Sequence, residues 1–512
     1  MSFFVAGILR IIMLEASAAL VLIARLVPAN DRRSQRRLDL AFRALAVLAL
    51  FSWTNYGSLR GGGNLVHRWE QYHFFFGSKY LPEVNYFDLY KATILADREL
   101  GGRITNSLRI TRDLATFDEE SVEQALPDAE RARIRANFSD ARWHDFVADW
   151  STLSRGNANW AQVLDDHGNS GSPAWALFAA PIARLVGIGP VGQTLMGLID
   201  PILMLALFIA CFYTFGTRPT CTMLIIWSMV PFSFDYLAGS LLRWDWLFAL
   251  GMCLVFWRRD KPLTAGAFLG YAVASKLFPL FFGVAFAFSA GWRMWRTRVL
   301  DQRVVRFAAG VVAAGIIAVL ASMLMFGGVA VWKSYERRIS TAQTEKFYSN
   351  QYSFRTTFLQ VAHSTPSELA QGWMEPREIK QGRRDVDIAN HKATFFLWQL
   401  ILTALVAVAV ARSQELEALA VGPLLVYVWL VVNAYYWNML ALPALAWSLR
   451  ETDGTRGRLA PLLGLHVLLI WFYVYQHLNH GFAEGYFVGL LMLTLLCVYF
   501  VTSLRTPSTN QR

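Results

Sequence analysis

Long apolar stretches recur along the whole of this 512-residue chain, and they limit what it can fold into. Many of them run for roughly 16 to 24 residues, which as helices would cross a bilayer core of about 30 Å. They do not alternate between apolar and polar residues, as the strands of a membrane barrel do. Only 17% of the residues are charged, whereas soluble proteins carry about a quarter. The sequence therefore predicts an all-α polytopic membrane protein.

The apolar stretches predict a bundle of about thirteen transmembrane helices. A further stretch, at 172–187, is expected to form a juxtamembrane or re-entrant helix, because a crossing there would move the basic residues 258–261 outside. Arg10 and Glu15 make the first stretch a poor span, and an interfacial helix is the alternative for it. The expected spans lie at 4–27, 39–57, 194–215, 221–236, 239–257, 263–275, 278–292, 304–326, 393–412, 418–435, 438–449, 459–476 and 485–503.

The net charge of +11 comes largely from basic clusters in the short connections between apolar stretches. This pattern is typical of cytoplasmic loops that face anionic lipid, and it argues against a nucleic-acid partner. With these connections inside, the segments 58–193 and 327–392 fall outside. We therefore expect a multi-pass membrane protein with its short basic connections on the cytoplasmic side. The clusters are Arg32, Arg33, Arg36 and Arg37; Arg258, Arg259 and Lys261; Arg293, Arg296, Arg298, Arg303 and Arg306; and Arg456 and Arg458.

This topology divides the chain into five parts. The first external loop contains a polar portion, at about 97–170, whose capping residues predict amphipathic helices that pack as a small lid. The five parts are N-terminal apolar segments at 1–57, a large extracytoplasmic loop with juxtamembrane helices at 58–193, a transmembrane bundle at 194–326, a second extracytoplasmic loop at 327–392 and a C-terminal transmembrane bundle at 393–512.

The stretch from His67 to Tyr90 directly follows an apolar run, and it holds carboxylates and histidines among aromatic residues. Glu70 is the leading candidate for a catalytic base, because it lies where a membrane enzyme would hold a proton acceptor. The alternative for Glu70 is a solvated loop acid. Asp88 is its rival as the base, although it could equally be a helix cap. The side chains of this stretch expected to contact a substrate are His67, Trp69, Tyr72, His73 and Tyr80.

Two cations are expected near the outer ends of spans, where charge close to hydrocarbon is costly and needs a reason. Arg243 either pairs locally with Asp245 or faces a phosphate. Lys276 is placed near the outer surface because Pro279 breaks the helix after it. It either extends its amine to the membrane interface or holds a lipid phosphate.

The second external loop adds Asn350, Gln351 and Arg355 to the candidate polar groups. Binding of lipid head groups and purely structural roles are the alternatives for them. The segment from Tyr435 to Asn438, at another outer helix end, is most simply an aromatic belt.

These motifs, in this order, resemble those of the GT-C class of membrane glycosyltransferases, and within it the bacterial polyprenyl-phosphate-mannose-dependent mannosyltransferases. Family members have an acid after an early span, then a tyrosine, a glycine with a small residue, and an aliphatic residue before a tyrosine. The stretch RRDKP followed by TAGAFLGYAVASKLFP is similar to the family's arginine turn with its K-x-x-P, and NQYSF is similar to its Asn-Gln-Ser element. The acid and the residues after it are matched here by Glu70, Tyr72, Gly77, Ser78, Leu89 and Tyr90.

The resemblance implies a GT-C-like fold and an inverting transfer of a sugar, with mannose favoured, from a polyprenyl-phosphate donor. The acceptor would be a glycan, lipid or protein on the extracytoplasmic face of a bacterial plasma (inner) membrane. Glu70 would accept the proton of the attacking hydroxyl, and Asn350 and Gln351 would contact the sugar or the acceptor. The residues expected to stabilise the charge on the donor phosphate are Lys276, Arg243 and Arg355. The family's acid is usually aspartate, whereas Glu70 stands here.

Two other functions are weighed against the enzyme: a transporter or flippase for a lipid-linked sugar, and a non-catalytic scaffold. A transporter needs ionisable residues along a path at the midplane, whereas the charges of this chain gather at outer helix ends. No cofactor is expected. A divalent cation is not expected either, although Asp165 with Asp166, or Asp235 with Asp245, could hold one.

Overall fold

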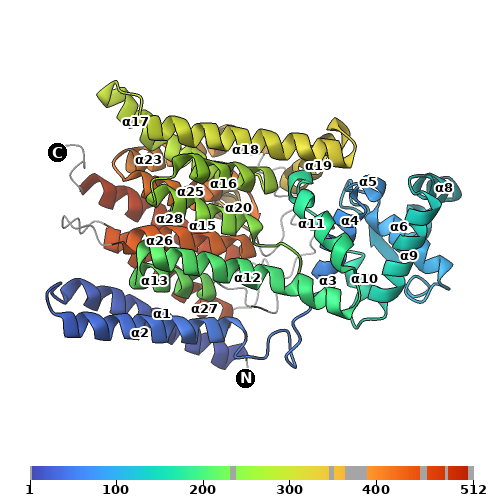
Figure 1. The fold of residues 1–512 in the computed structure, drawn as a ribbon, viewed down its shortest axis with the longest axis horizontal. Helices are drawn as coiled ribbons and strands as arrows, with labels where there is room; N and C mark the ends of the chain where they lie inside the picture. The colour runs from blue at the N-terminus through green and yellow to red at the C-terminus, as the bar shows by residue number, and fades with distance from the viewer. Residues whose placement is uncertain are drawn as a thin grey trace.

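The structure is a computed structural model, and it describes residues 3–230, 234, 238–344, 351–363, 389–449, 458–478 and 483–505. Helices account for most of it, with two short two-stranded sheets among the described residues. The helices form a long bundle and a smaller unit built on one end of that bundle (Figure 1). The helical class predicted from the sequence is therefore confirmed.

The bundle consists of apolar helices that lie roughly side by side along its length (Figure 1). Among the described residues, four helices are long and apolar enough to cross a membrane: α1 (Phe3–Leu26), α12 (Pro190–Phe215), α18 (Gln302–Phe326) and α23 (Lys392–Ala411). The other helices of the bundle are α2 (Arg32–Trp53), α13 (Thr217–Met229), α15 (Asp245–Arg258), α16 (Pro262–Ser275), α17 (Leu280–Thr297), α20 (Phe354–His363), α24 (Glu415–Ala420), α25 (Gly422–Trp429), α26 (Ala441–Ser448), α27 (Leu459–Leu478) and α28 (Ala483–Arg505).

Each expected span contains at least one helix, but two of the spans are interrupted. The span expected at 418–435 is divided between α24 and α25, and the chain leaves the helix at Leu430, where the backbone is extended. The span expected at 239–257 becomes helical only at Asp245, because the residues before it form a loop. The number of crossings therefore stays a prediction.

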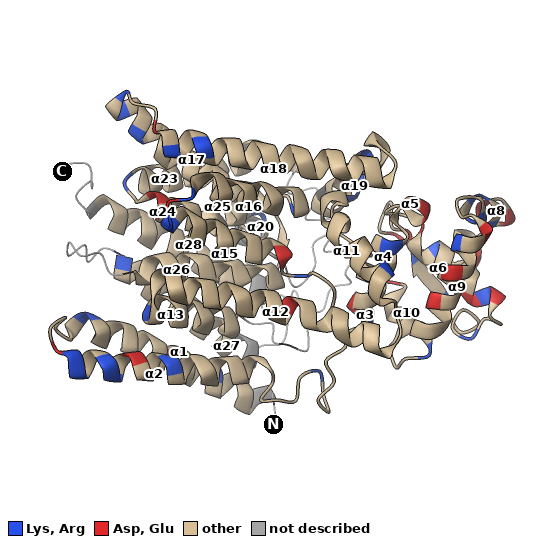
Figure 2. Ribbon diagram, viewed as in Figure 1, with Lys and Arg blue, Asp and Glu red and all other residues tan. Residues whose placement is uncertain are grey.

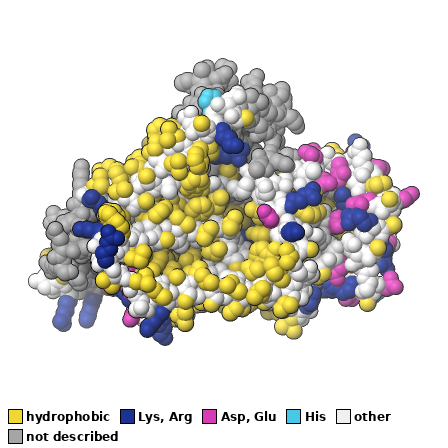
Figure 3. Space-filling view, turned by 90° about the horizontal axis from the view of Figure 1, so that it is seen from above, with side chains coloured by type: hydrophobic (Ala, Val, Ile, Leu, Met, Phe, Trp, Pro, Cys, Tyr) yellow, Lys and Arg dark blue, Asp and Glu magenta, His cyan; other side chains and the backbone are white. Residues whose placement is uncertain are grey.

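Charged side chains gather at the two ends of the molecule, and the middle of the bundle has few of them (Figure 2). A space-filling view shows the middle as a broad region of hydrophobic side chains (Figure 3). One end carries mainly Lys and Arg, at the turns after α1 and α17, while the smaller unit at the other end carries both signs. Because charge in hydrocarbon is costly, this separation supports a membrane protein with its charges outside the bilayer. The orientation stays a prediction.

Helices α16 and α18 approach each other closely through glycines. A Cβ atom at Gly266 would lie 2.0 Å from the backbone oxygen of Phe307 on α18. A Cβ atom at Gly310 would lie 2.1 Å from the backbone oxygen of Leu263 on α16. Small residues thus let the two backbones touch, which is a common way for membrane helices to pack.

The smaller unit covers residues 68–170, and we call it the lid. It has its own core, in which Tyr80, Phe146 and Trp150 are fully buried. The amphipathic helices expected within 97–170 are α8 and α9. The elements of the lid are α3 (Arg68–Gln71), the π-helix η1 (Tyr72–Phe76), α4 (Gly77–Lys79), α5 (Leu81–Val84), α6 (Leu89–Glu99), β1 (Ile110–Arg112), β2 (Glu119–Ser121), α7 (Val122–Ala125), α8 (Asp128–Ala136), α9 (Asp140–Ser154) and α10 (Trp160–Val163).

Two helices and a short sheet lie where the lid meets the bundle. α11 (Pro173–Val186) packs against α18 and against α4 of the lid. That this helix is juxtamembrane or re-entrant stays a prediction. α19 (Val329–Thr344) continues from α18 toward the lid (Figure 1). Strand β3 (Gln351–Tyr352) pairs antiparallel with β4 (Val432–Asn433), which leads into the 3-10 helix η2 (Ala434–Leu440).

Candidate functional site

A cavity of about 720 Å³ lies between the lid and the end of the bundle. Its walls come from α3, α19, the loop after α10, the loop before α15, the turn between α16 and α17, and the segment around β4. Such a concave site with a few charged groups among apolar and aromatic walls is the usual form of a ligand pocket. The charged residues that line it are Arg60, Glu70, Asp166, Arg243, Lys276 and Arg338.

Glu70 and Arg243 form an ion pair in this cavity. The Arg243 side chain is only 8% exposed and that of Glu70 is 18% exposed, so the pair is largely shielded from solvent. The guanidinium also lies over the rings of Tyr435, at 4.6 Å, and Phe74, at 5.4 Å. The local pair with Asp245, weighed from the sequence, is wrong, because the Asp245 carboxylate instead accepts hydrogen bonds from hydroxyls on α16.

Backbone contacts at Gly239 bring these two residues together. The Gly239 carbonyl oxygen accepts hydrogen bonds from the His67 amide, at 2.9 Å, and from Gln71 Nε2, at 2.9 Å. Gly239 has a φ of +81°, and a Cβ atom there would lie 1.8 Å from the Leu65 carbonyl oxygen. A side chain is thus excluded on both counts. This contact joins the helix that carries Glu70 to the loop that carries Arg243.

Asp200 holds the loop before α15 from the other side. Its carboxylate accepts hydrogen bonds from the backbone amides of Arg243 and Trp244, each at 2.9 Å. Asp200 is fully buried in α12, and its two oxygens bind the last two backbone amides of the loop that precedes α15. The apolar pattern of α12 gave no reason to single out this carboxylate. Its position in the structure indicates that it orients Arg243.

Asp200→Ala is expected to lower the free energy of unfolding by about 2 kcal/mol or more, because two buried amides lose their acceptors. The measurement is the thermal unfolding midpoint of the purified protein in detergent. Asp128→Ala is the control, since the Asp128 side chain is 96% exposed and surface changes usually stay within about 0.5 kcal/mol. Equal midpoints for the two variants would contradict the role given to Asp200.

Burial raises the pKa of Glu70 above the ordinary range of a glutamate, and the nearby Arg243 guanidinium opposes part of that rise. A carboxylate with a raised pKa is a stronger proton acceptor than a solvated one. The helix that positions it is capped by His67, whose Nδ1 accepts a hydrogen bond from the Glu70 amide at 3.4 Å. Glu70 therefore combines a fixed position with increased basicity.

A second carboxylate, Asp166, lines the same cavity from the loop after α10. Trp69 Nε1 donates a hydrogen bond to it at 2.6 Å, and the ring of His167 lies 3.2 Å from its other oxygen. Burial alone would raise its pKa, but these contacts outweigh burial, and the pKa lies below the ordinary range of an aspartate. Asp166 is thus a weaker base than Glu70. The sequence singled it out only as a possible metal ligand.

His73 lies behind this carboxylate, on the π-helical turn η1. Its Nδ1 is 3.9 Å from Asp166, and its Nε2 is 2.8 Å from the Tyr90 hydroxyl. Burial lowers the pKa of His73 to about 4, so the ring is neutral at pH 7 and its contact with Asp166 is then not an ion pair. The wider turn of the π-helix directs the His73 ring to the cavity wall, whereas a regular α-helix would direct this side chain elsewhere. Such π-helical turns are frequent at functional sites.

Lys276 reaches the cavity from the turn between α16 and α17. α16 ends at Ser275 and α17 begins at Leu280, as Pro279 predicts. The Lys276 ammonium donates to the Ser170 carbonyl oxygen at 3.0 Å and lies 6.0 Å from the Tyr436 ring centroid. Its charge therefore faces the same space as Arg243. Both Tyr435 and Tyr436 line the cavity, although the sequence suggested only an aromatic belt.

Several sequence candidates do not line the cavity. Tyr72 and Tyr80 are fully buried, and their hydroxyls are bonded to Thr93 and Asp149, so they support the lid and leave no face for a sugar. Asp88, the rival candidate for the base, does not line the cavity and pairs with Arg133 in the lid at 2.7 Å.

Three further candidates belong to the second external loop. Arg355 does not line the cavity itself. It donates a hydrogen bond at 2.8 Å to the carbonyl oxygen of Gln343, which does line it. The backbone of Gln351 pairs with that of Asn433, which lines the cavity. Asn350 lies outside the described residues.

The carboxylates considered for a metal ion are dispersed. Asp165 pairs with Arg112 at 2.9 Å, while Asp245 is bonded to Tyr271 and Ser275. Asp235 lies outside the described residues. Within the described part of the chain, no group of three or more His, Cys, Asp and Glu side chains is close enough to hold an ion.

The fold and the cavity together define a helical membrane protein with a charged pocket between its bundle and a lid. Comparisons with protein-family models, with curated proteins and with solved structures find no match to this chain. The function is therefore argued from the residues of the cavity.

Proposed function

We propose that this protein is an inverting glycosyltransferase. It moves a sugar, with mannose favoured, from a polyprenyl-phosphate donor to an acceptor on the extracytoplasmic face of the membrane. The observation that carries the proposal is the meeting of one buried carboxylate, Glu70, with two cations, Arg243 and Lys276, in a cavity at the end of the bundle. A donor with its tail in the bilayer would present its phosphate and sugar at that level.

Glu70 is the proposed general base. The acceptor hydroxyl oxygen attacks the anomeric carbon, and the bond from that carbon to the phosphate oxygen breaks. The phosphate leaves with the electron pair, and the hydroxyl proton passes to Glu70. A single displacement of this kind inverts the anomeric centre. The raised pKa of Glu70, caused by its burial, suits it to this step better than Asp166.

Arg243 and Lys276 are the proposed phosphate ligands. The donor is a phosphodiester with one negative charge, and a second charge develops on the phosphate as the sugar leaves. Positive groups held in a shielded site stabilise such charge more strongly in the transition state than in the donor. Arg60 and Arg338 line the same cavity, so four basic side chains face two carboxylates and the cavity favours an anionic group.

The remaining walls suit a sugar. Trp69 lines the cavity while its indole nitrogen is fixed by Asp166, which leaves a ring available for stacking on a sugar face. Asn433 and Gln343 add polar groups from β4 and α19. Tyr435 lies beneath Arg243 and stabilises the cation that would meet the phosphate.

The rate of transfer is expected to fall at acidic pH, with a midpoint above the ordinary range of a glutamate. A general base acts only when it is ionised, and burial raises the pKa of Glu70. Activity should therefore be complete above this raised pKa and lost as the pH falls through it. The measurement is kcat/KM from about pH 4 to pH 9, because this ratio reports ionisation of the free enzyme and a normal glutamate titrates near 4.3. A rate that stays constant down to the normal range would contradict this assignment.

The proposed function is tested with purified protein in lipid nanodiscs. Radiolabelled polyprenyl-phosphate mannose, glucose and arabinose are each offered together with a membrane extract as the source of acceptor. The expected result is time-dependent transfer of label from one donor, mannose first, to a product that no longer contains the polyprenyl chain. Absence of transfer from all three donors would contradict the proposal as stated.

A further inference from the structure

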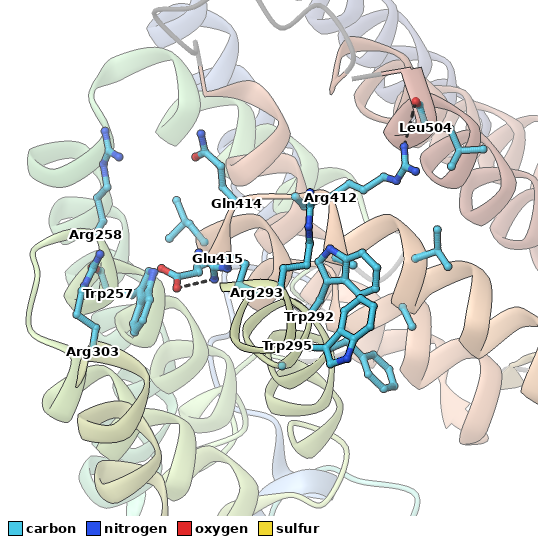
Figure 4. Close-up of a pocket in the computed structure, with 18 of the residues that line it drawn as sticks. Trp257, Arg258, Trp292, Arg293, Trp295, Arg303, Arg412, Gln414, Glu415 and Leu504 are labelled. Carbon is cyan, nitrogen blue, oxygen red and sulfur yellow. Dashed lines mark hydrogen bonds and ion pairs between the residues drawn. The ribbon is translucent and has the colours of Figure 1, made fainter. Parts of the chain in front are cut away.

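A second and larger cavity, of about 1310 Å³, lies between helix ends on the side of the bundle away from the lid (Figure 1), and Figure 4 shows it in close-up. It is formed by the ends of α15, α17, α23 and α28, the start of α18 and the segment that begins α24. None of its lining residues is shared with the cavity beneath the lid. It therefore needs a separate explanation.

The cavity carries an excess of positive charge. Five arginines line it, at Arg258, Arg293, Arg296, Arg303 and Arg412, together with two carboxylates. The carboxylates are both used: Glu415 pairs with Arg293 at 2.5 Å, and Asp260 pairs with Arg303 at 2.9 Å. What is left is a group of three arginines whose charge no carboxylate in the cavity balances.

The three remaining arginines are placed differently. Arg412 donates to the Leu504 carbonyl oxygen at 3.4 Å, which fixes it between α23 and α28 (Figure 4). The side chains of Arg258 and Arg296 are both exposed, and the described part of the chain gives neither side chain a hydrogen bond or ion pair. Two positive charges that line one cavity favour an anion there over a cation or a neutral group. The cavity is therefore suited to an anionic group.

The walls beside the arginines are apolar and open toward the outside of the bundle. Trp292 and Trp295 lie with ring centroids 5.0 Å apart and are 40% and 57% exposed. Val408 on α23 and Leu504 on α28 line the cavity and are 43% and 42% exposed. Tryptophan with its ring at this level is typical of the membrane interface, where the head groups meet the acyl chains. A ligand here would have a charged head and an apolar tail.

We propose that this cavity binds an anionic phospholipid. Its phosphate lies against Arg258 and Arg296, and its acyl chains run along Trp292, Trp295 and Val408. A free phosphate would use the arginines but not the exposed apolar wall, so the wall favours a lipid over a soluble anion. Basic pockets between transmembrane helices recognise anionic head groups in this way. The inference does not depend on the proposed transferase activity.

The test is lipid retention, measured by native mass spectrometry on the full-length protein in neutral detergent. Phosphatidylglycerol and phosphatidylcholine of equal chain length are added at increasing concentration. The wild type is expected to retain phosphatidylglycerol at least about tenfold better. The double variant Arg258→Gln/Arg296→Gln is expected to lose this preference, because it removes both positive charges that would meet the anionic head group.

Arg306→Gln is the matched control, since Arg306 lies on the first turns of α18 but does not line the cavity. It should retain phosphatidylglycerol as the wild type does, and all variants should keep the wild-type unfolding midpoint measured without added lipid. Equal retention of the two lipids by the wild type, or an unchanged preference in the double variant, would overturn the proposal. Competition by inorganic phosphate at about 10 mM distinguishes a phospholipid from a soluble anion as the occupant. Displacement of the lipid by phosphate would assign the cavity to a soluble anion instead.

Discussion

Glu70→Gln is expected to reduce the rate of sugar transfer at least about a hundredfold, because the neutral amide cannot accept the proton of the attacking hydroxyl. The change is nearly isosteric, and the amide oxygen can still accept a hydrogen bond from Arg243. Binding of the donor should therefore survive, so that kcat falls while the affinity for a polyprenyl phosphate changes little. Initial rates at saturating donor concentration give kcat. A separate titration with polyprenyl phosphate, the product of the donor, gives its affinity.

Two companion variants show whether the effect belongs to this carboxylate. Asp88→Asn is the control, because Asp88 pairs with Arg133 in the lid and does not line the cavity. It should leave the rate within about twofold of the wild type, because the changed side chain has no contact with the cavity. Asp166→Asn tests the neighbouring carboxylate, which should matter less as a base. A rate unchanged in Glu70→Gln but lost in Asp166→Asn would move the base to Asp166.

Arg243→Met is expected to lower kcat/KM about a hundredfold or more, because it removes a cation from the developing phosphate charge. It also leaves Glu70 buried without its partner, and breaking such a pair typically costs about 3 kcal/mol of stability. The Arg243 charge holds the pKa of Glu70 down against the effect of burial. Its loss should therefore move the acidic limb of the rate profile to higher pH.

This shift separates a role at the site from loss of folding. A variant that only destabilised the protein would lower the active fraction equally at every pH and leave the midpoint in place. Arg133→Met is the control, since it breaks the ion pair with Asp88 at an arginine that is 47% exposed. It should leave both the rate and the midpoint unchanged. An unshifted midpoint in Arg243→Met would contradict the coupling between Arg243 and Glu70.

Local rules predicted the elements that carry the site. The length of the apolar stretches predicted the helices of the bundle, and Pro279 predicted the break between α16 and α17 that places Lys276 on the cavity wall. The capping residues ahead of α8 and α9 predicted two helices of the lid. These features depend on residues close together in the chain, which is why they could be found without a structure.

The pairing within the site could not be predicted in the same way. Glu70 and Arg243 are 173 residues apart, and their meeting depends on the turn at Gly239 and on the buried Asp200. No pattern near Asp200 distinguishes it from a tolerated polar residue in an apolar helix. Asp166 likewise becomes a cavity residue only because the lid folds back over the end of the bundle.

The sequence also overestimated the value of aromatic residues as ligands. Tyr72 and Tyr80 were candidate ligand-binding residues because they lie near Glu70 in the aromatic stretch, but both are buried in the core of the lid. Tyr435 and Tyr436 were interpreted as an interfacial belt, yet they line the cavity beneath the two cations. Whether an aromatic ring faces a core, a lipid or a ligand depends on tertiary packing, which a short sequence pattern does not contain.

The central claim is that the cavity beneath the lid breaks a sugar–phosphate bond. Its most direct test uses sealed proteoliposomes containing a donor labelled on the sugar and, separately, on the polyprenyl chain, with acceptor extract added outside. The account predicts that the two labels separate, with free polyprenyl phosphate formed in proportion to the glycosylated product, and that Glu70→Gln prevents this. If both labels stay in one intact donor that only changes membrane leaflet, the protein is a transporter and the account is contradicted.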